Sequence, residues 1–333
     1  MNDKGAYAGL RVLDLGQGVA APYCAMFLAM HRAEVIKLEP LAGDRSRGLG
    51  TRYGDHTAMS AHYNRGKRGL ALDLKAPAAR EIAFSLAARA DIVIEGFRPG
   101  VAARLGLGYD ELRARSPRLL YLSVSGFGQE GPYAAVPCTD SVAQAFSGLM
   151  LAEHVLESGA PRQLNAPTGA YRTRDGWIMV ALVREEQYVR LMGALGRPDL
   201  TDDPRFADFA VRAANAPVLG DIVGRIIGTD TTEGWLGRLR AADILADRVN
   251  GFDDWLADPH IVATGGAVRV EQPEMGQFPT PRTPGMPLGV DAAMPPAPRI
   301  GEHGAAILAE IGINPAAIAR LRAENVLRIP EGL

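Results

Sequence analysis

The sequence predicts an α/β protein, with a doubly wound parallel sheet forming a Rossmann-like large domain and a second, smaller α+β domain. Short apolar runs alternate with helical patterns through the N-terminal half, which is typical of strands joined by helical crossovers. These runs are continuously apolar, as in strands covered on both faces. The chain has 333 residues, more than a single compact core usually contains.

Apolar runs predict the strands of the large domain. They are LRVLDL (10–15), EVIKLE (34–39), GLALDL (69–74), DIVIEG (91–96) and RLLYLSV (118–124). Apolar residues at helical spacing predict the intervening helices, which are PYCAMFLAM (22–30), AAREIAFSLAARA (78–90) and GYDELRAR (108–115). This alternation favours parallel strands, because each crossover returns the chain to the same end of the sheet.

The second half has a different pattern. AYRTRDGWIMVAL (170–182) predicts a hairpin with Asp175-Gly176 as its turn. Helical patterns follow at 184–195, 204–214, 217–227 and 231–241, and GAVRVEQ (266–272) predicts a strand. Seven prolines between Phe278 and Arg299 favour an extended, irregular segment.

HGAAILAEIG and PAAIARLRAE predict two helices at the end of the chain. We therefore expect a large domain at 1–160, a small domain with linkers at 161–300, and C-terminal helices at 301–333 that return to the large domain.

Composition excludes several classes of function. The chain is 47% hydrophobic and 22% charged with a net charge of −2, so it lacks the basic excess of a general nucleic-acid or membrane-surface binder. Cys24 and Cys138 form no disulfide framework, and neither they nor the six scattered histidines have metal-ligand spacing. The sequence contains no signal-peptide core and no apolar run of about 18 residues. We therefore expect a cytoplasmic protein without a metal site.

Ligands of doubly wound sheets bind beyond the carboxyl ends of the strands, where the first loop here is GQGVAAPY (16–23). It resembles a phosphate-binding loop, but Ala21 stands where the third glycine of G-x-G-x-x-G belongs. Glu39 ends the second strand, as a ribose-binding acid would. A nicotinamide-dependent dehydrogenase is therefore a partial match.

Two further stretches combine glycine with basic residues. EGFRPGVAARLG (95–106) places Gly96, Arg98 and Arg104 around a helix start, which suits either an anion site or a capped surface helix with solvated arginines. NRGKRGLALDLK (64–75) carries basic residues at both ends of a strand. It predicts either contacts to a phosphate-rich ligand or a solvated charge run.

The fifth strand leads into a loop and a helix. GFGQEGPY (126–133) must turn tightly or allow a close approach. CTDSVAQAFSGLM (138–150) then predicts an amphipathic helix capped by Thr139 or Asp140. Asp140 has two interpretations, a helix cap or a catalytic carboxylate.

In their order along the chain, these stretches resemble the family III CoA-transferases, also called the CaiB/BaiF family. The resemblance covers almost the whole chain. It rests on GLRVLDLGQGVAAPYCAMFLA, AEVIKLEP, GDRSRG, NRGKRGLALDLK, IEGFRPGVAARLGLGYDELRARSPRLLYLSVSGFGQEGPY and DSVAQAFSGLM, and it continues in NAPTGAYRTRDGWIMVAL, GRPDLTDDPRF and DWLADPH.

The resemblance implies transfer of coenzyme A from an acyl-CoA to a carboxylic acid, without a metal or a covalently bound cofactor. It also implies an interlocked homodimer. Carried over from the family, the residues that contact coenzyme A would be Val19, Ala20, Leu72, Lys75, Gly96, Phe97, Arg98 and Arg104. Family members often have Asn where this chain has Gly96.

The family's nucleophilic Asp lies in a segment of the type I-x-D-x-x-x-G, for which no counterpart is found here. SGLM continues directly into LAEHVLESGAPRQLNAP, which indicates an internal deletion after Met150. Asp140 is then the candidate surrogate nucleophile. A non-catalytic CoA-binding paralogue or decayed gene product is the alternative to a working transferase. An isomerase like the related α-methylacyl-CoA racemases is less favoured, because Thr139 stands at about the position of the histidine in their acid/base pair.

Overall fold

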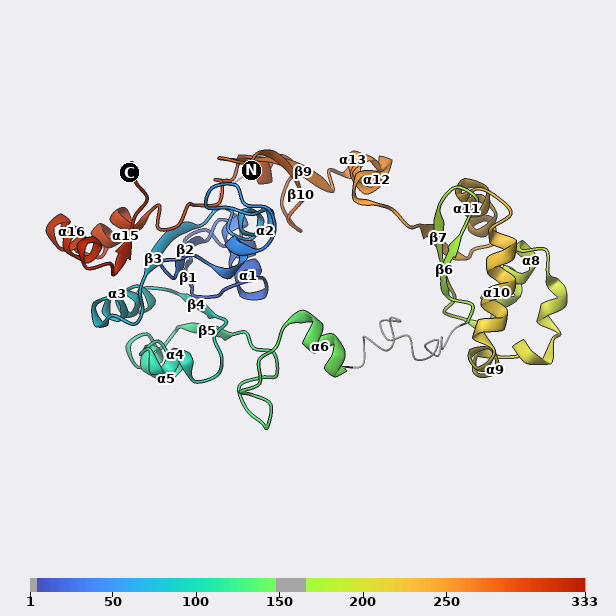
Figure 1. Cartoon of the computed structure of the whole chain (residues 1–333), viewed down its shortest axis with the longest axis horizontal. Helices are drawn as coiled ribbons and strands as arrows, with labels where there is room; N and C mark the ends of the chain where they lie inside the picture. Colours follow the sequence, from blue (N-terminus) through green and yellow to red (C-terminus); the bar gives the residue numbers. More distant parts are fainter. Residues whose placement is uncertain (1–4, 148–165, 333) are drawn as a thin grey trace. The chain divides into compact units, whose positions relative to one another are not determined.

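A computed structural model describes residues 5–147 and 166–332. The predicted junction at Met150 lies outside these residues. The chain divides into two compact units, one formed by Met1–Thr139 with Pro259–Leu333 and the other by Asp140–Asp258. Figure 1 shows the elements of both, and each unit is described by itself below.

The first unit is built on a six-stranded sheet with the order β11-β3-β2-β1-β4-β5. Its strands are β1 (Arg11–Asp14), β2 (Glu34–Glu39), β3 (Arg68–Leu72), β4 (Ile92–Glu95), β5 (Leu120–Ser123) and β11 (Leu327–Arg328). The first five strands pair in parallel, and β11 pairs antiparallel with β3. The predicted doubly wound fold is confirmed. The strand order reverses between β1 and β4, which is where such sheets bind ligands.

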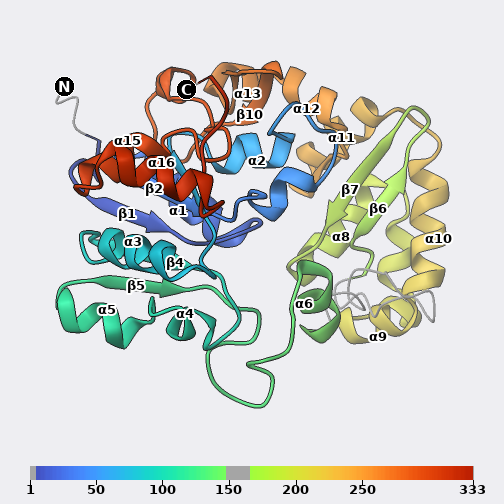
Figure 2. The same ribbon diagram turned by 60° about the vertical axis from the view of Figure 1, so that its left-hand side comes forward.

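Helices cover both faces of this sheet (Figures 1 and 2). Leu13, Leu38 and Leu70 belong to a buried cluster on one face with residues of α3 (Pro77–Ala87), α15 (Gly304–Glu310) and α16 (Pro315–Ala323). Val12 and Val35 pack on the other face with Ala25 of α1 (Ala20–Met30). Neighbouring strand residues thus go to opposite cores, as the pleat requires. Short helices complete this part of the unit: η1 (Arg45–Gly48), α2 (Ala58–Tyr63), α4 (Val101–Arg104) and α5 (Tyr109–Arg115).

The segment after residue 258 differs from the expectation. It contains α13 (Pro259–Thr264), β9 (Ala267–Gln272), β10 (Gly276–Pro281) and α14 (Val290–Ala293). The proline-rich segment begins as a strand, with Pro279 paired opposite Arg269 and Pro281 opposite Ala267. Prolines fit here because β9 and β10 form a two-stranded sheet, and proline is tolerated on strands with an unpaired edge.

The domain boundaries also differ from the predicted 161–300. Residues 259–300 belong to the unit of the large sheet, and Gln272 shows how they are held there. Its side-chain amide hydrogen-bonds the backbone of Ala297 in both directions, at 3.0 and 2.9 Å, and it contacts His56 at 3.2 Å. The contact with His56 joins residues 216 positions apart, and no local pattern predicts it.

The second unit combines helices with a three-stranded sheet of order β6-β7-β8. The predicted hairpin is confirmed, because Arg172 pairs with Trp177. Thr173 N–H donates to Gly176 O at 3.0 Å, so Arg174 and Asp175 form the centre of the turn in place of the predicted Asp175-Gly176. The third strand, β8, was not predicted. The elements are α6 (Asp140–Ser147), β6 (Gly169–Arg172), β7 (Trp177–Ala181), α8 (Glu185–Ala194), η2 (Pro198–Thr201), η3 (Pro204–Phe206), α9 (Phe209–Ala214), α10 (Ala216–Ile227), α11 (Thr232–Ala241), β8 (Leu245–Arg248) and α12 (Phe252–Ala257).

This unit has its own core, in which Leu191, Phe206 and Trp235 are buried. The buried guanidinium of Arg212 lies over the ring of Tyr188, 4.1 Å from its centroid, and pairs with Glu185. In the described residues of both units, no helix is long and apolar enough to cross a membrane.

Candidate functional site

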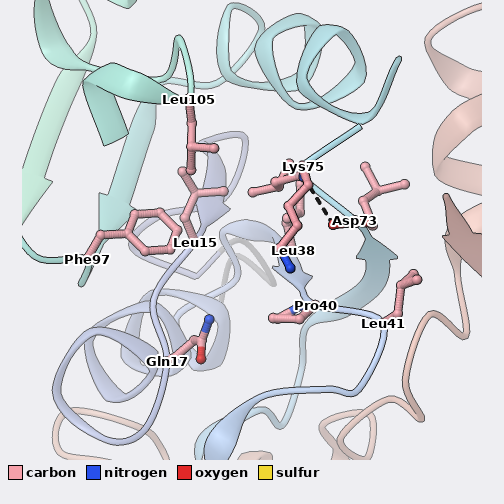
Figure 3. Close-up of a pocket in the computed structure, with 11 residues that line it drawn as sticks. Leu15, Gln17, Leu38, Pro40, Leu41, Asp73, Lys75, Phe97 and Leu105 are labelled. Atoms are coloured by element: carbon pink, nitrogen blue, oxygen red, sulfur yellow. Dashed lines mark hydrogen bonds between the residues drawn. The ribbon is translucent and has the colours of Figure 1, made fainter. Parts of the chain in front are cut away.

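A pocket of about 410 Å³ lies at the carboxyl ends of the parallel strands in the first unit. Residues that follow β1, β2, β3 and β4 converge on it, which is the position expected for a ligand site in a doubly wound sheet. It is lined by Leu15, Gln17, Leu38, Pro40, Leu41, Leu72, Asp73, Leu74, Lys75, Phe97 and Leu105. Figure 3 shows how these side chains surround the space.

Most of the lining is apolar, and few polar groups reach it. The Phe97 ring and the Lys75 side chain lie on opposite sides of the pocket (Figure 3). Phe97 N–H donates to Glu95 Oε2 at 2.7 Å, and Lys75 N–H donates to Asp73 Oδ1 at 3.0 Å. These bonds fix the two loops that carry the ring and the ammonium group. Such a pocket suits a ligand with an apolar body and an anionic part.

The predicted contact residues fall into two groups. Leu72, Lys75 and Phe97 line the pocket. The others do not line it, although they lie within three positions of a lining residue in the sequence: Val19, Ala20, Gly96, Arg98 and Arg104.

The stretch after β4 differs from the expected helix start. The helix α4 is a single turn of four residues, and Gly100 before it has a left-handed backbone with φ of 79°. One turn provides little dipole to attract an anion. Arg98 and Arg104 are both exposed, so any role of this stretch in anion binding rests on their side chains.

Gln17 was missed by the sequence analysis, and its backbone is held firmly. Gly16 N–H donates to Asp14 Oδ1 at 2.9 Å, and Gly18 N–H donates to Asp44 Oδ1 at 2.9 Å. The ammonium of Lys37 donates to Gly16 O. Buried charged side chains therefore fix both peptide groups beside Gln17. Its signal in the sequence is its place directly after the first strand, between two glycines.

The side chains that hold this loop form a buried ion network. Lys37 Nζ lies 2.8 Å from Asp44 and 3.6 Å from Asp14, and Lys67 Nζ lies 2.8 Å from Asp14. Although burial favours the neutral amine, Asp14 and Asp44 raise the pKa of Lys37. Burial also opposes ionisation of Asp44, but Lys37 lowers the pKa of that carboxyl. The network is therefore charged, and it stabilises the loop beneath the pocket.

The basic stretch 64–75 is mostly structural. Arg65 donates to the backbone carbonyls of Glu271 and Met294, each at 2.9 Å. Arg68 forms ion pairs with Glu34 and Glu310 at the amino end of β3. Lys67 is enclosed in the buried network, so among the four basic residues of this stretch Lys75 alone lines the pocket.

Glu39 is not available as a ribose-binding acid. It is fully buried and accepts two bonds from Arg47, at 2.9 and 2.8 Å, and a third from Asp44 N–H at 2.7 Å. In addition, a Cβ on Gly16 would lie 2.4 Å from the Ala21 Cβ. The first glycine thus serves close packing against α1. These contacts argue against the nicotinamide interpretation.

Asp140 begins α6 in the second unit and is exposed. Its Oδ2 accepts a hydrogen bond from Gln144 Nε2 at 2.8 Å. In the preceding glycine-rich loop, a Cβ on Gly126 would lie 2.0 Å from the Cys138 Cβ, so close packing requires glycine there. In the described part of the chain, no cluster of three or more His, Cys, Asp or Glu forms a metal site.

Comparison with known proteins defines the class to which this fold and pocket belong. The model of CoA-transferase family III matches residues 7–165 and 151–304, and the chain belongs to this family. The predicted family and fold are therefore confirmed.

Two relatives are similar over nearly their full lengths. A succinyl-CoA–D-citramalate CoA-transferase of Chloroflexus aurantiacus is 29% identical, with 96% of this chain and 97% of the relative covered. A succinate–glutarate CoA-transferase of Agrobacterium fabrum is also 29% identical, with 93% and 96% covered.

Solved structures give the same result. Rv3272 of Mycobacterium tuberculosis superposes with a TM-score of 0.71 at 26% identity, covering 91% of this chain and 99% of that one. A CaiB/BaiF family protein of Brucella suis superposes with a TM-score of 0.69 at 26% identity, covering 92% and 100%.

Proposed function

We propose that this chain binds an acyl-CoA in the 410 Å³ pocket and transfers coenzyme A to a carboxylic acid. The observation that carries the proposal is the convergence of Leu72, Lys75 and Phe97 at the carboxyl ends of the strands. The names of the relatives support it, because each describes transfer of coenzyme A between acids. The partners are then an acyl-CoA and a carboxylic acid, and we expect a cytoplasmic homodimer.

Each part of the pocket has a role in this proposal. Leu15, Leu38 and Phe97 offer apolar surface to the ligand, and Lys75 offers one positive charge to a phosphate. Gln17 adds an amide group at the edge of the pocket. Transfer begins when a carboxylate oxygen attacks the thioester carbonyl, the C–S bond breaks and the CoA thiolate leaves with the bonding electrons.

A specific observation favours a second candidate, a CoA-binding protein without turnover. The match to the C. aurantiacus enzyme extends over 393 aligned residues, although this chain has only 333. The two segments matched by the family model overlap at 151–165, beside the proposed deletion after Met150. If the deleted segment carried the nucleophile, Asp140 would have to replace it.

Binding of coenzyme A tests the assignment of the pocket. Isothermal titration with CoA is expected to show saturable binding that Lys75→Gln weakens about 3- to 10-fold, because one exposed ion pair is lost. Arg322→Gln on α16 changes an exposed arginine that does not line the pocket and should bind as the unchanged protein does. Absence of CoA binding, or equal affinity in Lys75→Gln, would contradict the pocket assignment.

A second measurement separates the two candidates. The protein is incubated with a panel of acyl-CoAs and carboxylic acids, trapped with hydroxylamine and mapped by mass spectrometry. Exchange of CoA with an adduct on Asp140 supports a working transferase, and Asp140→Asn should then abolish both. CoA binding without an adduct or exchange supports the non-catalytic candidate.

A further inference from the structure

A second pocket of about 210 Å³ lies at the opposite end of β3. Its lining includes residues 66–68 at the start of the strand, the proline-rich residues 295–299, and two histidines, His56 and His303. It shares no lining residue with the first pocket. The length of β3 places the two pockets roughly 15 Å apart, at about 3.3 Å per strand residue.

The hydrogen bonds of Gln272 determine which ring nitrogen of His56 carries the proton. Gln272 Oε1 accepts from Ala297 N–H at 2.9 Å, and Nε2 donates to Ala297 O at 3.0 Å, so the orientation of this amide is determined. The same Nε2 lies 3.2 Å from His56 Nε2, which must therefore accept. The neutral imidazole then carries its proton on Nδ1.

That N–H is a buried donor in need of an acceptor. His56 is fully buried, and its Nδ1 finds no hydrogen-bond partner within the described residues. Buried polar groups are almost always satisfied, so this donor indicates an oxygen atom beside His56, which lines the pocket.

Two more donors belong to the same pocket. His303 Nδ1 accepts from Gly69 N–H at 3.1 Å, which leaves the proton on Nε2. Burial lowers the pKa of both His56 and His303, which keeps the two imidazoles neutral. Arg299 is half-buried, and its guanidinium makes no ion pair with any described residue.

The other basic residues that line this pocket are already paired. Lys67 Nζ donates to Asp14, to Pro22 O and to Asn64 Oδ1, which uses all three of its protons. Arg68 is paired with Glu34 and Glu310. Glu302 accepts the backbone N–H of Arg299 at 2.6 Å and contributes the one carboxylate of the lining.

We propose that this second pocket binds a small carboxylate, with its oxygens accepting hydrogen bonds from His56, His303 and Arg299. Two neutral N–H donors and one guanidinium match the two oxygens and single charge of a monocarboxylate. The volume of about 210 Å³ is below the roughly 300–1,000 Å³ of sites for larger ligands, which favours an acid of a few atoms. The site does not depend on CoA transfer, because it lies at the other end of the sheet.

Acetate titration of the isotope-labelled full chain tests this site directly. Long-range ¹H–¹⁵N spectra are expected to show His56 protonated on Nδ1 and His303 on Nε2, with saturable shifts of both when acetate replaces chloride. Variants at each histidine assign the signals. Arg299→Gln should weaken acetate binding about tenfold or more, because it removes a charge-assisted hydrogen bond. Arg322→Gln is the control and should bind acetate unchanged.

The outcomes that overturn the proposal are equally direct. One is the absence of a saturable shift at about 100 mM acetate, which would populate any site of millimolar affinity; a structural water then satisfies His56. Another is equal acetate affinity in Arg299→Gln and the unchanged protein. A variant of His56 that fails to fold leaves the test intact, since Arg299→Gln alters only a half-buried side chain.

Discussion

The fold buries Lys67 and thereby disfavours the charged form of its side chain. Its ammonium is buried and donates to Asp14, Pro22 O and Asn64. Burial nevertheless lowers its pKa to about 8 from an ordinary value of 10.5, with Asp14 opposing the shift. Desolvation thus destabilises the ammonium form of Lys67 more than these partners stabilise it.

This shift predicts how stability depends on pH. Between pH 8 and 10.5 the unfolded chain binds more protons at Lys67 than the folded chain does, so the free energy of unfolding should rise with pH. The contribution of one group is at most about 1.4 kcal/mol per pH unit. Urea denaturation across this window should show a more positive slope of the free energy of unfolding against pH for the unchanged protein than for Lys67→Met.

Burial also raises the pKa of Cys24, which acts in the opposite direction, so both proteins are compared in a Cys24→Ala background. Parallel slopes in the two proteins would contradict the assignment.

Gly96 is one of the residues that we propose to contact CoA, and the family resemblance indicates that Asn often occupies this position. The three atoms nearest to a Cβ built there are Ala21 Cβ, Gly16 Cα and Gln17 N, at 3.5 to 4.0 Å, which is ordinary contact. We therefore expect Gly96→Asn to fold with unchanged stability and to bind CoA about 2- to 10-fold more tightly, through one added hydrogen bond. Calorimetric titration with CoA measures the effect. Gly16→Ala is the control that should fail, since its Cβ would lie 2.4 Å from that of Ala21. Weaker CoA binding by a stable Gly96→Asn protein would place the ligand elsewhere.

Among the strands, most of those that the sequence predicts are buried, and those that it misses are short or contain proline. The strands β1 to β4 were predicted because each is a mainly apolar run whose side chains are largely buried. β5 was predicted from its apolar run, although Leu120 and Leu122 are exposed. The strands β8 (LADR) and β11 (LR) are short, and β8 is mostly exposed, so neither produces a periodic signal. In β10, Pro279 and Pro281 suppress the prediction of a strand. The strands β8 and β11 also depend on partners that are distant in the sequence, β7 and β3.

The same reasoning applies to the elements of the site. The family resemblance implied Leu72, Lys75 and Phe97 as contact residues, and all three line the pocket. The rule for doubly wound sheets independently placed a ligand site at the ends of the predicted strands. Glu39 and Lys67 look like surface charges in the sequence. Their partners Arg47 and Asp14 are what make them internal, and long-range pairing of this kind leaves no local pattern.

At the scale of the whole molecule, the first unit is assembled from both ends of the chain. It combines Met1–Thr139 with Pro259–Leu333, and the second unit is inserted between them. Ile307, Leu321 and Leu327 share a buried cluster with Leu70 of β3. The sequence predicted the two helices of the last segment. It did not predict β11, which follows them and pairs with β3 in the large sheet.

This arrangement predicts that a chain ending at Asp258 cannot form the first unit. Truncation removes Ile307, Leu308, Leu321 and Leu327 from the core, each worth about 1.5–3 kcal/mol when fully buried. Their sum, on the order of 6–12 kcal/mol, is comparable with the roughly 5–15 kcal/mol that stabilises a whole domain. Near-ultraviolet circular dichroism and urea denaturation should show loss of one cooperative transition.

The second unit should retain its own transition, because its core lies within Asp140–Asp258. Truncation after Pro330 removes only the last residues beyond β11 and should leave both transitions unchanged. A fragment ending at Asp258 that bound CoA like the full chain would show that the sheet and its pocket form without the C-terminal segment.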